Sequence, residues 1–514
     1  MKYPIGIQQF EKLREEGWVY VDKTSHIHQL VSKGSYYFLS RPRRFGKSLL
    51  ISTLKAYFEG RKDLFQSLAM EQLEQEWRVH PVLHLDLNIE KYASQESLDN
   101  ILETNLVQWE KLYGADPSER SFSLRFAGII RRAYEKTGER VVILVDEYDK
   151  PLLQSISNKA LQDEFRATLK SVYGALKTMD GCIRFALLTG VTKFSKVSVF
   201  SDLNNMEDLS MNTAYYDLCG ISEQELHDVF DEEVGELAKA NGQTKEEAYE
   251  MLKQRYDGYH FAPDTLGMYN PFSVLLTLKN RQYGSYWFST GTPTYLVELM
   301  KEVDMNPKEL SGYEASASEL DSVQIMVDNP IAVLYQSGYL TIKDYDRSVR
   351  LYTLDYPNEE VKEGFVSFLM PYYTPISQND SPSFVGKFVR EVRNGKVDAF
   401  MLRLKALMAD TPYEVIRDLE VHYQNVMFIF TKLMGLYVQA EYRTSRGRID
   451  LTIGTDKYVY IIELKLDGSA EEALAQINEK DYALPFAVDG REIVKIGANI
   501  TSETRNLERW VVEG

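Results

Sequence analysis

Cysteine is nearly absent from this sequence, since its 514 residues contain only Cys182 and Cys219. Two cysteines exclude a disulfide framework and a cysteine-rich zinc module, and their scarcity fits a reducing compartment. Long apolar runs are also missing: stretches such as Val141–Val145 are far shorter than the roughly 20 residues that cross a bilayer. The N-terminus, MKYPIGIQQFEKLREEG, lacks an apolar core of signal-peptide length. We therefore expect a soluble, cytoplasmic protein without a membrane partner.

Positive charge is also in deficit. Lysine and arginine number 59 against 76 aspartates and glutamates, a net charge of −17. This balance argues against a protein that coats polyanions generally, but local patches can still contact nucleic acid. One such patch runs from Arg41 to Lys62, a segment that contains seven basic residues and a single acidic residue, Glu59. The 44% apolar and 26% charged residues are ordinary globular usage, which excludes wholesale disorder.

The first half of the chain alternates short apolar runs with longer helical patterns. Strands are predicted at Ser35–Ser40, Val82–Leu87, Val141–Val145 and Ile183–Thr189. Helices are predicted at about Lys47–Phe58, Ser97–Tyr113, Ser121–Lys136 and Asn158–Met179. Strands that alternate with helices of this length predict an α/β fold with a parallel sheet covered on both faces.

The second half has a different pattern. Residues 222–375 are predicted to be mostly helical, Gln378–Ser383 is the best linker candidate, and helices follow to about Tyr437. A β-hairpin is then expected from Arg448–Gly454 and Tyr458–Leu466. These shifts predict three domains, at 1–221, 222–377 and 384–514.

A phosphate-binding loop is suggested between the first strand and the first helix of the sheet. Gly46 lets the backbone approach a phosphate, Lys47 can reach the β- and γ-phosphates, and Ser48 can ligate Mg²⁺. The helix N-terminus adds its dipole, and Arg44 is a further nucleotide-binding candidate. The strict pattern requires glycine six residues before the lysine, where this chain has Arg41. A Gly-Lys-Ser triplet by itself is most often without function.

A second pattern strengthens the prediction of ATP binding. The apolar strand Val141–Val145 runs into Asp146 and Glu147. Asp146 can hold Mg²⁺ through water, and Glu147 can polarise the attacking water. Thr189, at the end of the next buried strand, can sense the γ-phosphate. The alternative is a buried strand that ends in a solvated acidic turn, with Thr189 a polar strand-end residue.

The C-terminal hairpin carries Asp450 on one strand, with Glu463 and Lys465 on the other. Glu463 and Lys465 share one face, because side chains alternate along a strand. A turn at Thr455–Asp456 is expected to place Asp450 opposite residues near 461–462. Two carboxylates and a backbone carbonyl, that of Leu464, form a hard oxygen site suited to Mg²⁺. The alternative is a cross-strand salt bridge, which is the commoner origin of such a motif in isolation.

Two stretches resemble known families. Residues 436–500 resemble the PD-(D/E)XK nuclease superfamily, in the branch that follows AAA-ATPase-like domains in bacterial proteins, and carry GRIDL, YIIELKLDG, EEALAQI, KDYA and VKIG. Residues 1–220 resemble the AAA-ATPase-like domain of that family and carry YVDKT, RPRRFGKSLL, LVDEYDKPLL, LLTGVTKFS and VFSDLNNMEDLS. YDGYHF and YNPFS are similar to the family's middle region.

The resemblance implies roles for individual residues. It places Asp450, Glu463 and Lys465 at the nuclease's metal and catalytic positions. Gln476 matches a glutamine that supports the site, and Glu420 is the choice for the acid that precedes the hairpin. The loop RPRRFGK matches the family's own version of the phosphate-binding loop, Arg41 included.

The implied fold is a P-loop NTPase domain, a helical middle region and a restriction-endonuclease-like domain. The implied activity is an ATP-regulated, Mg²⁺-dependent nuclease that acts on nucleic acid, with DNA the expected substrate; homo-oligomerisation is left open. The alternative is a nucleotide-dependent switch or scaffold whose nuclease-like domain binds nucleic acid or a partner without cleaving. A helicase-like motor is weaker, because no second motor domain can be placed.

Overall fold

The chain folds into two compact units, one comprising Met1–Asp304 and Ser311–Val361, the other Met305–Leu310 and Lys362–Gly514. The structure is a computed structural model, which describes residues 1–156, 158–193, 206–288, 296, 310–321, 330–373, 380–408, 426–427, 429–432, 434, 439–445, 448–486, 490–504 and 506–514. Across these residues no helix is both long enough and apolar enough to cross a membrane. The domain limits 1–221, 222–377 and 384–514 stay predictions.

The first unit contains a five-stranded sheet in the order β2-β3-β4-β1-β5, in which every neighbouring pair is parallel. Its strands are β1 (Tyr36–Ser40), β2 (Val82–Asp86), β3 (Val141–Asp146), β4 (Ile183–Gly190) and β5 (Glu207–Asp208). All six residues of β3 are buried, as expected for a strand covered on both faces. The four predicted strands and the parallel sheet are confirmed.

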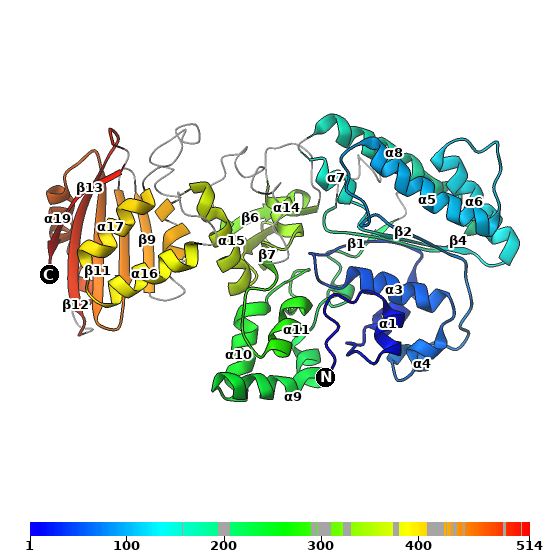
Figure 1. The fold of residues 1–514 in the computed structure, drawn as a ribbon, viewed down its shortest axis with the longest axis horizontal. Coiled ribbons are helices and arrows are strands. Elements are labelled where there is room, and N and C mark those ends of the chain that lie inside the picture. The colour runs from blue at the N-terminus through cyan, green and yellow to red at the C-terminus, as the bar shows by residue number, and fades with distance from the viewer. Residues whose placement is uncertain are drawn as a thin grey trace. The chain divides into compact units, whose positions relative to one another are not determined.

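Helices cover both faces of this sheet (Figure 1). One face carries α5 (Gln95–Tyr113), α6 (Phe122–Thr137) and α8 (Lys159–Thr178), and the other carries α3 (Lys47–Phe58). Shorter helices complete the layers: α1 (Phe10–Glu15), α2 (Thr24–Lys33), α4 (Ala69–Leu73) and α7 (Lys150–Gln154). Because β4 lies between β1 and β3, the C-terminal ends of these three strands meet at one edge, where ligands bind in open α/β sheets.

The middle of the chain is helical, as predicted, but also contains a sheet that the sequence analysis did not anticipate. The helices are α9 (Glu223–Asn241), α10 (Lys245–Tyr256), α11 (Pro271–Asn280), α13 (Ala317–Asp321) and α14 (Ile331–Gln336). The sheet has the order β6-β8-β7, with β6 (Tyr313–Ser316), β7 (Thr341–Asp346) and β8 (Leu351–Asp355), and α15 (Glu359–Tyr373) follows. β6 and β7 were missed because they are short and rich in polar residues, and β8, although its burial alternates, has only five residues.

The second unit is built on a mixed sheet in the order β13-β12-β11-β10-β9. Its elements are α16 (Ser381–Arg393), α17 (Val397–Met408), β9 (Gln439–Ser445), β10 (Arg448–Gly454), β11 (Tyr458–Leu466), α19 (Ala470–Glu479), β12 (Glu492–Thr501) and β13 (Asn506–Glu513). The hairpin strands have the predicted bounds. The predicted linker is wrong for residues 381–383, which form the first turn of α16; a proline fits there because that turn needs no backbone donor. Part of the helical stretch predicted up to Tyr437 lies outside the described residues.

Candidate functional site

The predicted phosphate-binding loop connects β1 to α3 at the C-terminal edge of the parallel sheet. Arg44 and Gly46 both have left-handed backbone conformations, with φ of 70° and 96°. A Cβ on Gly46 would meet no atom within 4 Å, so glycine is needed there for its conformation rather than for space. The loop therefore turns sharply into the N-terminus of α3, where Lys47 and Ser48 begin the helix.

Lys47 is buried at the centre of this loop, with 4% of its surface exposed. Its Nζ donates to the carbonyls of Arg41 at 3.1 Å and Pro42 at 3.4 Å. The same Nζ lies 3.3 Å from Oε1 of Glu147. The structure thus brings together a lysine and a glutamate that follow different strands, as the sequence predicted for a nucleotide site.

Asp146 and Thr189 lie at neighbouring strand ends and are directly bonded. The Thr189 hydroxyl donates to Oδ1 of Asp146 at 2.6 Å, and the Glu147 backbone N–H donates to the same oxygen at 3.1 Å. Glu147 has a left-handed φ of 53°, a conformation that costs free energy for a residue with a Cβ.

A cleft of about 850 Å³ opens beside the loop. Arg44, Gly46, Lys47, Ser48 and Glu147 line it. Several further walls were not predicted as site residues; the first is the N-terminal stretch 4–8, and the second is Pro271, Phe272 and Leu275 at the start of α11. The volume falls in the range of about 300–1,000 Å³ found for small-molecule sites. The only sequence signal for the second wall was the likeness of YNPFS to the family's middle region.

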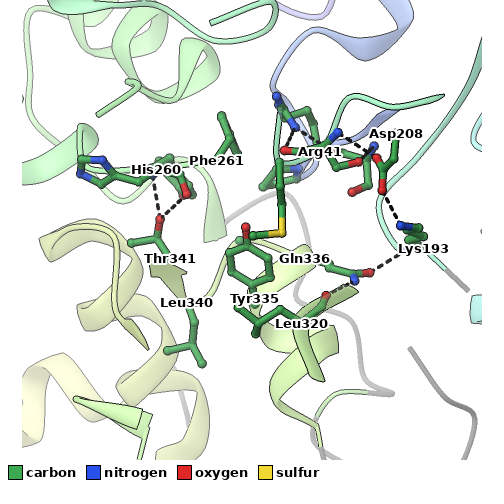
Figure 2. Close-up of a pocket in the computed structure, with 16 residues that line it drawn as sticks. Arg41, Lys193, Asp208, His260, Phe261, Leu320, Tyr335, Gln336, Leu340 and Thr341 are labelled. Carbon is green, nitrogen blue, oxygen red and sulfur yellow. Dashed lines mark hydrogen bonds and ion pairs between the residues drawn. The ribbon is translucent and has the colours of Figure 1, made fainter. Parts of the chain in front are cut away.

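Arg41, at the position where the strict loop pattern has glycine, is a buried anchor (Figure 2). Its guanidinium donates to the carbonyls of Ser40 at 2.9 Å, Ser210 at 2.8 Å and Tyr215 at 3.1 Å. It also lies 4.2 Å from the ring centroid of Phe261. Burial lowers the pKa of the Arg41 guanidinium. Arg41 lines a cavity of about 30 Å³, room for about one water, rather than the large cleft.

Four aromatic residues of the middle region surround the loop, and we call them the aromatic collar: Tyr259, Phe261, Phe272 and Trp287. The Phe45 ring packs edge-on against Tyr259 at 4.7 Å and Phe261 at 5.3 Å between ring centroids. The Arg44 guanidinium lies 4.8 Å from the Phe272 ring, and Trp287 Nε1 donates to the Arg43 carbonyl at 3.1 Å. The conformation of the loop therefore depends on side chains more than 200 residues away.

The basic patch predicted between Arg41 and Lys62 is wrong as a single surface. Arg41 and Lys47 are buried. Arg61, on the exposed side, pairs with Glu11, Glu15 and Asp63. The linear count failed because residues in this segment lie in different environments: Arg41 and Lys47 are buried, and Arg61 is held in ion pairs.

Asp149 is a buried acid that the sequence analysis did not single out. Its Oδ2 accepts hydrogen bonds from the Val191 and Thr192 backbone N–H groups at 3.0 and 2.6 Å and from the Thr192 hydroxyl at 2.7 Å. Burial, followed by the nearby charge of Glu147, raises the pKa of Asp149 to about 7. Asp149 thus fixes the chain that leaves β4 immediately after Thr189. The signal was present as an acid directly after the predicted site residues.

In the C-terminal hairpin, Asp450 stands directly opposite Glu463 in the register of β10 and β11. The predicted pairing with residues near 461–462 is wrong by up to two positions, because Gly454 pairs with Val459 and the turn is four residues long rather than two. A shift of two residues keeps each strand's faces unchanged, whereas a shift of one would exchange them. The correction therefore brings the two carboxylate positions closer than expected.

Glu463 is buried, with 1% of its surface exposed, and its partner on the other side is Gly497 of β12. A Cβ at Gly497 would lie 2.2 Å from the Ala470 carbonyl, so only glycine lets α19 pack this closely beside Glu463. Lys465 is half-buried two residues further along β11, and Gln476 is half-buried on α19. The side chain of Asp450 and the whole of Glu420 lie outside the described residues, so the group of five predicted residues is seen only in part.

Metal ligands could come from either site. No group of three or more histidine, cysteine, aspartate or glutamate side chains is arranged to hold a metal within the described part of the chain. Asp450 and Glu420, two of the predicted ligands, have side chains beyond that part. In the predicted nucleotide site, Ser48 and Asp146 are the predicted metal ligands.

Comparison with known proteins finds two families. The family described as predicted AAA-ATPase matches residues 4–200, and the PD-(D/E)XK nuclease superfamily matches residues 418–510. A protein of Azotobacter chroococcum mcd 1, named "Uncharacterized protein in vnfD 5'region", is 35% identical over 529 residues, covering 100% of this chain and 99% of the relative. No solved structure matches.

Proposed function

The chain belongs to the family that joins a predicted AAA-ATPase domain to a PD-(D/E)XK nuclease domain, and from that premise we propose that it is an ATP-binding, Mg²⁺-dependent nuclease under nucleotide control. The observation that best supports nuclease activity is the direct cross-strand pairing of Asp450 with Glu463. Lys465 follows Glu463 by two residues on the same strand. The proposed domains are 1–221 for ATP, 222–377 as a connecting region and 384–514 for cleavage.

The donor set of the hairpin fits Mg²⁺. Two carboxylates and the Leu464 carbonyl are hard oxygen ligands, which Mg²⁺ prefers, and Glu420 is a further proposed ligand. When bound, the ion would lower the pKa of a coordinated water and stabilise negative charge on the phosphate. Lys465 would donate a hydrogen bond that orients the attacking water, or take its proton. Gln476, on the adjacent helix, would support the position of these groups.

The proposed nucleotide site uses residues that line the cleft, together with Asp146 and Thr189 at the neighbouring strand ends. The backbone at Gly46 and the ammonium of Lys47 would bind phosphate oxygens, with Arg44 at the rim. Ser48 and Asp146 are oxygen donors at the positions that hold Mg²⁺ in such sites. Phosphate would compete with Glu147 for the Lys47 ammonium, which would free Glu147 to accept a proton from water. Thr189, which is hydrogen-bonded to Asp146, would sense the γ-phosphate from the end of β4.

Cleavage is the direct test of the nuclease. Plasmid DNA and DNA and RNA oligonucleotides are incubated with the full chain and Mg²⁺, with and without ATP. We expect cleavage by the wild type and by Lys457→Ala, a matched change at an exposed lysine in the turn of the same hairpin. Lys465→Ala should not cleave. Wild-type activity in Lys465→Ala contradicts the assignment, and a wild type that binds nucleic acid without cutting it supports the scaffold.

ATP binding is tested separately. Calorimetry with a non-hydrolysable ATP analogue and Mg²⁺ should show binding to the wild type that Lys47→Ala loses, because the Lys47 ammonium is the group proposed to bind the phosphate oxygens. A folded wild type that does not bind the analogue would contradict the nucleotide half of the proposal.

A further inference from the structure

Glu360 is a fully buried acid in the first turn of α15 and does not line the nucleotide cleft. Its carboxylate accepts hydrogen bonds from two separate segments of the middle region. Oε1 accepts from the Trp287 backbone N–H at 2.8 Å, and Oε2 accepts from the Ser273 hydroxyl of α11 at 2.7 Å. Burial raises the pKa of Glu360 to about 7, although the bonds from Trp287 and Ser273 oppose the shift. Because a buried carboxylate is costly to leave without donors, Glu360 holds these two segments together.

Both hydrogen-bond donors to this carboxylate lead directly to the phosphate-binding loop. Trp287 also donates, through its side-chain Nε1, to the Arg43 carbonyl at 3.1 Å. Ser273 directly follows Phe272, and the Phe272 ring lies 4.8 Å from the Arg44 guanidinium. One buried carboxylate is therefore linked to two consecutive loop residues by two separate routes.

Asn358, just before α15, provides a similar link to the next loop residue. Its Nδ2 donates to the Asp257 carbonyl at 2.8 Å, and its Oδ1 accepts from the Val361 backbone N–H at 3.1 Å, in the first turn of α15. Two residues after Asp257 comes Tyr259, whose ring packs edge-on against Phe45. Three consecutive loop residues are thus linked to the start of α15, each through a different part of the middle region.

The helix anchored in this way continues into the other compact unit. The first unit ends at Val361, and the chain from Lys362 onward, including most of α15, belongs to the unit that contains the nuclease hairpin. Hydrogen-bond networks and helices are elements that transmit coupling between distant sites. We propose that Asn358 and Glu360 are positioning residues that couple the nucleotide state of the loop to the nuclease through α15. The inference rests on the proposed nucleotide control and names the residues that transmit it.

The test measures, in the full chain, the ratio of the cleavage rates with and without ATP. In the wild type this ratio should differ from one by at least about fivefold, the lower end of allosteric coupling. Glu360→Ala should bring the ratio close to one, while cleavage without ATP and binding of a non-hydrolysable ATP analogue persist; a merely structural loss would lower all of them together. Glu360→Gln should keep the wild-type ratio, because its amide can accept from the Trp287 N–H and donate to the Ser273 hydroxyl. Glu359→Ala is the matched control, since Glu359 is the exposed acid beside Glu360 in the same turn.

Each outcome has a distinct meaning. A wild-type ratio in Glu360→Ala overturns the coupling role and leaves both proposed sites standing. A folded wild type that binds the analogue but cleaves at the same rate with and without ATP overturns the proposed nucleotide control, and the coupling role with it. If Glu360→Ala does not fold, Ser273→Ala, which removes the hydrogen bond to Oε2 alone, repeats the test. A ratio equal to that of the wild type in this folded variant then overturns the coupling role.

Discussion

The P-loop sequence pattern and the structure predict opposite effects when Arg41 is replaced by glycine. Arg41→Gly restores the glycine of the strict P-loop pattern, so the pattern alone predicts stronger nucleotide binding. The structure predicts the reverse, because the Arg41 guanidinium satisfies the carbonyls of Ser40, Ser210 and Tyr215 and lies against Phe261. The φ of Arg41 is not positive, so glycine would relieve no backbone strain.

The expected loss can be bounded from these contacts. A buried carbonyl left without a donor costs roughly 1–3 kcal/mol, but the Tyr215 carbonyl would keep a second donor, the Leu218 backbone N–H at 3.3 Å. The three costs do not add in full, because removal of the guanidinium also recovers its own desolvation penalty. Glycine adds about 0.5–1 kcal/mol through the greater freedom of the unfolded chain. We expect the free energy of unfolding to fall by about 3 kcal/mol, the upper end of the usual range for a single destabilising substitution.

Urea unfolding of the full chain, followed by tryptophan fluorescence, measures this loss, and calorimetry measures ATP affinity. Arg41→Lys is the matched variant: it keeps the charge but not the planar fork, so its stability should lie between those of wild type and Arg41→Gly. An Arg41→Gly protein that is as stable as wild type and binds ATP more tightly would refute the reasoning.

Three further substitutions test the two sites. Glu147→Gln should bind ATP but hydrolyse it more slowly, and so change nucleic acid cleavage. Equal cleavage by wild type, Lys47→Ala and Glu147→Gln, with and without ATP, would show that the nucleotide site and the nuclease site act independently. Asp149 has a folded pKa of about 7 against about 3.9 when unfolded, so the free energy of unfolding should fall as pH rises from about 4 to about 7 and then level off. Asp149→Asn should flatten that slope in urea melts at pH 5 and pH 8, and an unchanged slope would exclude Asp149 as its cause. Asp450→Ala should abolish cleavage with little change in thermal midpoint, and a destabilised variant that still cleaves would favour a salt bridge.

The C-terminal hairpin shows which features could be predicted from the sequence and which could not. The apolar runs determined both strand limits, and alternation placed Glu463 and Lys465 on one face. The length of the turn is not encoded in that alternation, so the pairing of Asp450 was predicted up to two positions away. Register is set by turn geometry, which a two-residue assumption at 455–456 did not capture.

The positions of the proposed nucleotide-binding residues in the fold could be predicted where a local pattern sufficed. Lys47, Asp146, Glu147 and Thr189 lie at or just after the ends of strands that could be recognised, and parallel pairing brings strand ends together. The aromatic collar and the wall at Leu275 could not be predicted, because they depend on which distant segments pack on the loop. Arg41 could not be understood from the loop alone, since its three acceptors include Ser210 and Tyr215, about 170 residues away.

The aromatic collar also has a consequence for how the chain is made. The hydrogen bond from Trp287 to the Arg43 carbonyl spans 244 residues. At about 5–20 residues per second on the ribosome, the loop emerges roughly 10–50 s before its last collar residue is synthesised. During that interval Phe45 has at first neither Tyr259 nor Phe261 to cover it. We therefore expect a nascent chain that ends before residue 259 to be unable to hold the loop in its final shape, so that nucleotide binding follows synthesis of the middle region.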